Sequence, residues 1–139
     1  MRLLIVDDSN LIRTFIARIA AGNGHAPAPE LPGQPGQPVL PGLPALSIVG
    51  LARNGTEALE LARQTLPEVV TLDITMPEMD GLQCLDQLTQ IVPGARILMV
   101  SALSDKATAI TALKKGAHGF LHKPFTEEDL VAALREVLA

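Results

Sequence analysis

Aromatic side chains are scarce in this sequence of 139 residues. It contains no tryptophan or tyrosine, and its three phenylalanines are Phe15, Phe120 and Phe125. A series of aromatic residues on which bases could stack is therefore missing, and a flavin would find no aromatic partners. Basic residues are also few, because 11 of them face 15 acidic residues and the net charge is −4. We therefore expect no nucleic-acid partner.

Cysteine and long apolar runs are scarce as well. The single cysteine, Cys84, cannot form a disulfide within the chain, which is typical of a protein in a reducing compartment. No apolar run approaches the roughly 20 residues of a membrane-spanning helix, and the apolar N-terminal run is too short for a secretory signal peptide. These features predict a cytoplasmic protein without a membrane partner.

Five short aliphatic runs alternate with stretches that have apolar residues at helical spacing. The runs lie at residues 3–6, 47–52, 68–72, 96–100 and 118–122. They lack polar alternation, which is typical of parallel strands covered on both faces. The alternation predicts an α/β fold with a doubly wound, flavodoxin-like sheet of five parallel strands in the order 2-1-3-4-5. The length suits one domain spanning residues 1–139.

A proline-rich segment at residues 26–46 interrupts this alternation between the first helix and the second strand. From Pro29 to Pro44 a proline occupies every third position, which matches the three-residue turn of a polyproline II helix. Interspersed glycines weaken that pattern. We favour a solvated loop insertion, and the other interpretation is a docking strand for a protein that recognises proline.

Polar residues follow four of the five aliphatic runs. Asp7 and Asp8 follow the first run, Asp73 the third, Ser101 the fourth and Lys123 the fifth. In a doubly wound sheet these positions share the edge at which ligands bind. Three neighbouring carboxylates repel one another unless a cation is present, and oxygen ligands suit Mg²⁺. A cation beside a lysine predicts a phosphoryl-transfer site, although a structural lysine–aspartate bridge without a metal stays open.

Three stretches that contain most of these polar residues resemble the receiver domain of bacterial response regulators, especially stand-alone receivers of the chemotaxis type. They read LLIVDDSNLIR at residues 3–13, TLDITMPEMDG at 71–81 and KPF at 123–125. Similar stretches cover nearly the whole chain except residues 26–46. The resemblance implies that residues 1–139 form a single receiver domain with a loop insertion at residues 26–46.

The resemblance also implies a role for each residue of the predicted site. Asp73 is expected to accept the phosphoryl group as the nucleophile. The expected Mg²⁺ ligands are Asp7, Asp8, Asp73 and the backbone carbonyl of Thr75, with Asp7 holding the ion through water.

Further roles follow for three residues near the ends of the last two strands. Ser101 is expected to donate its hydroxyl to the phosphoryl group and to move towards it. Lys123 is expected to pair with the phosphoryl group or, before transfer, with Asp73. Phe120 matches the family's rotating aromatic residue, and the family usually has a cis bond before the proline that corresponds to Pro124.

The function implied by this resemblance is a phosphorylation-dependent signalling switch. A sensor histidine kinase is the expected phosphodonor, and an output protein is expected to bind the surface of the fourth helix, fifth strand and fifth helix. The chain is not expected to be an enzyme beyond promoting its own phosphorylation and dephosphorylation.

Two other functions stay open. One is a Mg²⁺-dependent phosphohydrolase with an aspartate nucleophile, although Thr75 stands where such enzymes need a second aspartate. The other is a non-catalytic interaction module that acts through the proline-rich loop.

Overall fold

The computed structural model describes residues 1–21, 46–74, 81–102 and 106–139, and it contains five strands and five helices. The strands are β1 (Arg2–Val6), β2 (Ser47–Ala52), β3 (Val69–Asp73), β4 (Arg96–Ser101) and β5 (Gly119–His122). The helices are α1 (Asn10–Ala20), α2 (Gly55–Thr65), α3 (Gly81–Ile91), α4 (Lys106–Lys114) and α5 (Glu127–Leu138). Within the described ranges, no helix is both long and apolar enough to cross a lipid bilayer.

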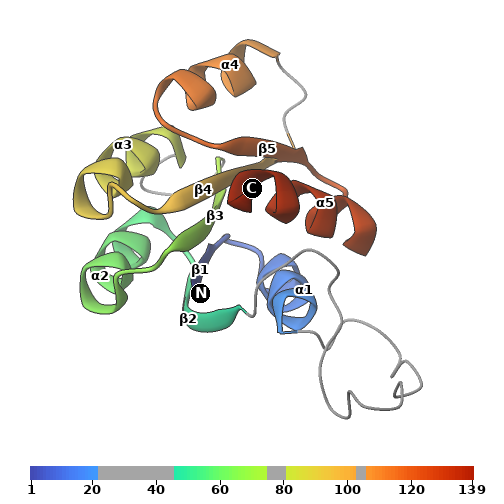
Figure 1. Cartoon of the computed structure of the whole chain (residues 1–139), viewed down its shortest axis with the longest axis horizontal. Coiled ribbons are helices and arrows are strands. Elements are labelled where there is room, and N and C mark those ends of the chain that lie inside the picture. The colour runs from blue at the N-terminus through green and yellow to red at the C-terminus, as the bar shows by residue number, and fades with distance from the viewer. Residues whose placement is uncertain (22–45, 75–80, 103–105) are drawn as a thin grey trace.

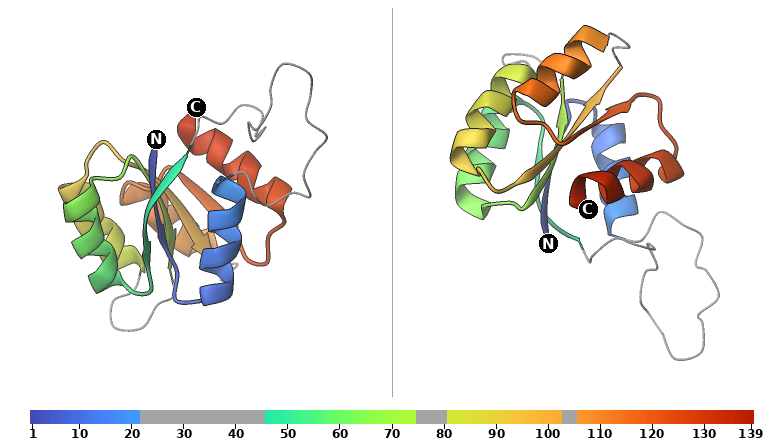
Figure 2. Two further views of the ribbon diagram at one scale, coloured as in Figure 1. Left: turned by 90° about the horizontal axis from the view of Figure 1, so that it is seen from below. Right: turned by 45° about the horizontal axis from the view of Figure 1, so that its top comes forward.

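The strands form one parallel sheet in the order β2-β1-β3-β4-β5, and helices cover both of its faces (Figures 1 and 2). This confirms the predicted fold class and strand order. The helices α2 and α3 pack on one face, and α1 and α5 pack on the other. Helices therefore cover the middle of each central strand on both faces of the sheet. The predicted site residues lie at the carboxyl ends of these strands.

Each central strand contributes alternate side chains to two separate apolar cores. Along β1, Leu4 and Val6 belong to the core under α2 and α3, whereas Leu3 and Ile5 belong to the core under α1 and α5. All four side chains are almost completely buried. Burial on both faces explains why the aliphatic runs show no polar alternation.

Side-chain caps fix the beginnings of three helices. Ser9 accepts a hydrogen bond from the backbone N–H of Ile12 at the start of α1. Asn54 caps α2 by accepting from the backbone N–H of Glu57. A capping box begins α5, because the side chains of Thr126 and Asp129 each bond to the backbone of the other residue. Such caps satisfy N–H groups that have no partner inside the helix.

Two strands extend one residue beyond their predicted ends. Asp73 is the last residue of β3, and Ser101 is the last residue of β4, whereas both were predicted to follow their strands. The reason is continued pairing of the backbone, since Asp73 is in register with Val100 and Ser101 with His122. The predicted insertion at residues 26–46 lies outside the described residues except for Leu46.

Candidate functional site

The carboxylates of Asp7, Asp8 and Asp73 converge at the carboxyl end of the sheet. The neighbouring strands β1 and β3 are parallel and in register up to Val6 and Leu72. The next residues along the chain, Asp7 directly after β1 and Asp73 at the end of β3, therefore lie side by side. One oxygen from each of the three carboxylates lies within 4.8 Å of the other two. Asp7 and Asp73 are only 1% and 2% exposed, whereas Asp8 faces solvent.

Lys123 brings one positive charge to this group of acids. Its backbone N–H donates to the carbonyl of Ser101 at 2.8 Å, which continues the β4–β5 pairing by one residue beyond β5. Its Nζ lies 2.8 Å from Oδ2 of Asp7 and 3.5 Å from Oδ2 of Asp73. The following peptide bond, Lys123–Pro124, is cis, as the sequence resemblance implies. Lys123 thus contacts both buried acids and lies closer to Asp7 than to Asp73, with which it was expected to pair.

The two carboxylate oxygens of Asp7 have different surroundings. Oδ1 accepts a hydrogen bond from the backbone N–H of Ser9 at 2.9 Å. Oδ2 is buried and has no hydrogen-bond partner in the described part of the chain, so its contact with Lys123 is an ion pair without a directed hydrogen bond. The ammonium of Lys123 offsets part of the charge of this buried carboxylate, and a bound cation would supply further positive charge.

The residues present therefore fit a hard divalent cation. Three carboxylates face a single ammonium, which leaves negative charge uncompensated. All the clustered ligand atoms are oxygens, which Mg²⁺ prefers. Asp7, Asp8 and Asp73 are the described residues that could hold such an ion. The backbone carbonyl of Thr75, also a predicted ligand, lies outside the described residues.

Ser101 lies on β4, which pairs with β3, and Phe120 lies on β5, which pairs with β4. Ser101 is fully buried at the end of β4, one residue beyond the position that pairs with Asp73. Phe120 is partly buried on β5, packs against the core under α2 and α3, and has an edge-on ring contact with His122 at 5.2 Å. The sheet therefore brings Ser101 to the edge that carries the acids, with Phe120 on the adjacent strand.

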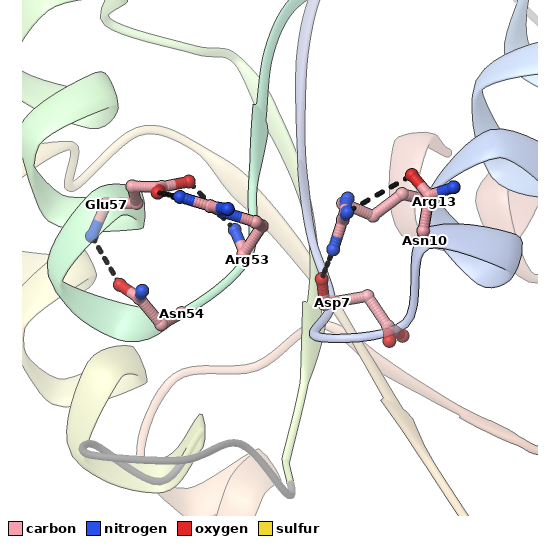
Figure 3. A network of polar contacts seen from close by, with 6 residues as sticks. All are labelled: Asp7, Asn10, Arg13, Arg53, Asn54 and Glu57. Atoms are coloured by element: carbon pink, nitrogen blue, oxygen red, sulfur yellow. Dashed lines mark hydrogen bonds and ion pairs between the residues drawn. The ribbon is translucent and has the colours of Figure 1, made fainter.

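Figure 3 shows polar residues near the site that the sequence interpretation missed. Arg13 of α1 is 8% exposed and donates to the carbonyl oxygen of Asp7 at 2.6 Å and to Oδ1 of Asn10 at 3.2 Å. It shares the buried face of α1 with Ile16 and Ala20. An arginine within the apolar stripe of a helix was the signal that could have identified it.

A second missed pair, Arg53 and Glu57, lies at the start of α2. The carboxylate of Glu57 accepts from the backbone N–H of Arg53 at 3.0 Å and from its guanidinium at 3.1 Å and 3.2 Å. These hydrogen bonds, the backbone one first, lower the pKa of Glu57, and the charges of Arg53 and Arg13 lower it further.

Comparisons with known proteins show which family the sequence matches. The family model described as the response regulator receiver domain matches residues 42–135. The chemotaxis protein CheY of Listeria monocytogenes is 35% identical over 136 residues, which cover 98% of this chain and 97% of that protein. The chemotaxis protein CheY of Bacillus subtilis is 35% identical over 137 residues, which cover 99% of this chain and 97% of that protein.

Solved structures resemble this fold over nearly its full length. The CheX–CheY–BeF3–Mg²⁺ complex from Borrelia burgdorferi contains a chain that matches with a TM-score of 0.81 and 28% identity, covering 100% of this chain and 90% of that chain. The signal receiver domain of NarL from Mycobacterium tuberculosis matches with a TM-score of 0.75 and 32% identity, covering 96% of this chain and 91% of that chain.

Proposed function

Because this chain belongs to the response regulator receiver family, we propose that phosphoryl transfer to Asp73 is the event that drives its signalling switch. Response regulators of this type act in two-component signalling, as phosphorylation-dependent switches rather than as classical enzymes. The observation that carries the proposal is the meeting of Asp73 with Asp7, Asp8 and Lys123 at one edge of the sheet.

The chemistry follows from a carboxylate nucleophile beside an ammonium group. An oxygen of Asp73 attacks the phosphorus of a phosphohistidine on a sensor histidine kinase, and an O–P bond forms as the N–P bond breaks. The imidazole leaves with the bonding electrons and takes up a proton. Lys123 lies 3.5 Å from the nucleophilic carboxylate and stabilises the negative charge on the phosphoryl oxygens.

Mg²⁺ is the cation that this proposal assigns to the acidic group. Asp7, Asp8 and Asp73 would hold it, together with the carbonyl of Thr75. When bound, the ion supplies positive charge that offsets the charge of the phosphoryl group. The convergence of three carboxylates, two of them buried, supports this assignment.

The output of the switch is proposed to pass through Ser101 and Phe120. Ser101 would donate its hydroxyl to the new phosphoryl group, and Phe120 would turn inwards, which biases an existing equilibrium between two conformations. A partner protein would then recognise the altered surface of α4, β5 and α5. Exposed Ile110 and Leu113 on α4 supply apolar area for such a contact.

The remaining parts of the proposal concern the whole chain. Residues 1–139 are proposed to form one cytoplasmic receiver domain with an insertion at residues 26–46. This domain is proposed to promote its own phosphorylation and dephosphorylation. The two alternative functions, a phosphohydrolase and a module acting through its proline-rich loop, gain no support from the relatives. Turnover of phosphate monoesters by the purified chain would favour the first alternative.

Labelling with acetyl phosphate tests the proposal. Wild-type protein is expected to gain one acid-stable, base-labile phosphoryl group in the presence of Mg²⁺ and none in the presence of EDTA. Asp73→Asn should abolish labelling because it removes the nucleophile. The matched control, Asp86→Asn, removes a surface aspartate that pairs with Lys115 and should be labelled as wild type. Labelling of Asp73→Asn to the same extent as Asp86→Asn and wild type would refute the proposal.

A further inference from the structure

Arg13 is a buried cation whose hydrogen-bond acceptors are both neutral. Its guanidinium donates to the backbone carbonyl of Asp7 at 2.6 Å and to the side-chain oxygen of Asn10 at 3.2 Å (Figure 3). Within the described residues it forms no ion pair. Burying a guanidinium without a direct anionic partner is unfavourable.

The guanidinium of Arg13 lies against the turn that carries two of the three clustered acids. Arg13 contacts the backbone of Asp7, while the carboxylate of Asp7 points away from the guanidinium (Figure 3). Oδ1 of that carboxylate accepts from the Ser9 backbone, and Oδ2 faces Lys123. Arg13 therefore contacts neither carboxylate oxygen of Asp7, and these oxygens remain in contact with Ser9 and Lys123.

The carbonyl that Arg13 holds belongs to the peptide unit that joins Asp7 to Asp8. A peptide unit is planar, so fixing its oxygen fixes the rotation of the whole unit and the direction in which Asp8 leaves it. A hydrogen bond from a charged donor at 2.6 Å is a strong restraint. The bond from Ser9 to Oδ1 restrains the Asp7 side chain of the same turn.

We propose that Arg13 is a positioning residue that sets the orientation of the Asp7 and Asp8 carboxylates for Mg²⁺. This inference rests on the proposed function, because it assigns the cation to those acids. Arg13 acts through the backbone and touches neither the ion nor the phosphoryl group. Residues that orient metal ligands commonly change metal affinity tenfold or more when they are replaced.

The charge and the geometry of Arg13 have opposite effects on Mg²⁺ affinity. A positive charge near the acids opposes a second cation, so its removal alone would strengthen Mg²⁺ binding. Loss of the hydrogen bonds to Asp7 and Asn10 would weaken binding, because the ligands would no longer be held in place. The sign of the change therefore distinguishes positioning from simple electrostatics.

The test compares Arg13→Met, Arg13→Lys and Arg53→Met in the full chain. Arg53→Met is the matched control, because Arg53 bonds to the exposed Glu57 side chain and not to the β1–α1 turn. Mg²⁺ alone is titrated and followed by ¹H–¹⁵N NMR. Arg13→Met is expected to raise the Mg²⁺ Kd about tenfold, with Arg13→Lys between it and wild type. Arg53→Met should bind Mg²⁺ as tightly as wild type or more tightly.

A kinetic measurement separates positioning from general damage to the fold. The rate of labelling by acetyl phosphate should reach within about twofold of wild type when Arg13→Met is saturated with Mg²⁺, because the nucleophile and Lys123 are unchanged. An Arg13→Met protein with unchanged or tighter Mg²⁺ binding would overturn the inference. If Arg13→Met does not fold, Arg13→Lys decides: weaker Mg²⁺ binding with normal saturated labelling supports positioning, and wild-type Mg²⁺ binding refutes it.

These outcomes are separable from a failure of the proposed function. If wild-type protein binds no Mg²⁺ and takes no label on Asp73, the proposed function fails and the role of Arg13 fails with it. If wild-type protein does both and the Arg13 variants match it, only the positioning role is wrong.

Discussion

The ammonium of Lys123 lies 2.8 Å from Oδ2 of Asp7 and 3.5 Å from Oδ2 of Asp73. The lysine therefore bridges two acids from neighbouring strands, and it reaches them from the far side of β4. Its side chain is 16% exposed, and both carboxylates are almost fully buried. Before a phosphoryl group arrives, the ammonium of Lys123 is thus a positive partner shared by both buried carboxylates.

Removal of that ammonium should destabilise the protein in a way that Mg²⁺ partly reverses. Lys123→Met leaves Asp7 and Asp73 facing each other without a cation, and breaking a buried ion pair typically costs about 3 kcal/mol or more. Urea unfolding with and without Mg²⁺ measures the loss, which should be smaller with the ion. The control is Lys115→Met, whose exposed pair with Asp86 contributes less than about 1 kcal/mol. Equal losses in the two variants would contradict this account of Lys123.

Gly81 should be essential for the position of Asp73. A Cβ atom at Gly81 would clash with the backbone carbonyl of Asp73 and with Cα of Ile74. Because both obstacles are backbone atoms, Gly81→Ala must shift the end of β3, at a cost of about 2 kcal/mol or more. We expect a lower free energy of unfolding together with slower labelling by acetyl phosphate.

Gly94 provides the matched control for that substitution. A Cβ atom at Gly94 would meet nothing within 4 Å, so Gly94→Ala should retain wild-type stability and labelling. A Gly81→Ala protein that is labelled as fast as Gly94→Ala would show that the end of β3 tolerates the displacement.

The stability of the fold should decline in mildly acidic solution because of His118. Its Nδ1 accepts the backbone N–H of Ile97 at 3.1 Å, which requires an unprotonated Nδ1. Burial, and secondarily the charge of Arg96, lower the pKa of His118 below its usual 6.5. The unfolded chain therefore binds this proton more readily than the folded chain. The contribution is complete well above pH 6.5 and is lost as the pH falls from there towards the lowered pKa.

Urea unfolding at about pH 7.5 and about pH 5.5 brackets this transition. His118→Gln keeps an acceptor but cannot take up the proton, so its stability should depend less on pH than that of wild type. His122→Gln serves as the control, since His122 makes a ring contact with Phe120 rather than a backbone hydrogen bond. If His118→Gln retains the full wild-type dependence, another group is responsible for the decline.

The fold and the convergence of the acids could be predicted because each depends on local patterns. Aliphatic runs without polar alternation indicated buried parallel strands, and the two-sided cores under β1 show why. Once the strands are parallel, residues after their carboxyl ends must share one edge, as Asp7 and Asp73 do. The prediction needed no knowledge of side-chain geometry.

Other features could not be predicted because they depend on tertiary geometry. Sequence polarity placed Asp73 and Ser101 after their strands, yet their backbones remain in the ladder. The closer approach of Lys123 to Asp7 depends on differences below 1 Å. Arg13 was missed because no sequence pattern reveals that a charged side chain points from the buried face of a helix to a particular carbonyl.

Trapping of the acyl phosphate provides the most direct test of the central claim. Wild-type protein treated with acetyl phosphate and Mg²⁺ is reduced with borohydride, which converts a phosphorylated aspartate into homoserine, and its peptides are sequenced by mass spectrometry. The account predicts homoserine at position 73 and at no other aspartate. Homoserine at another position, or none at position 73 in protein that has taken up phosphate, would contradict it.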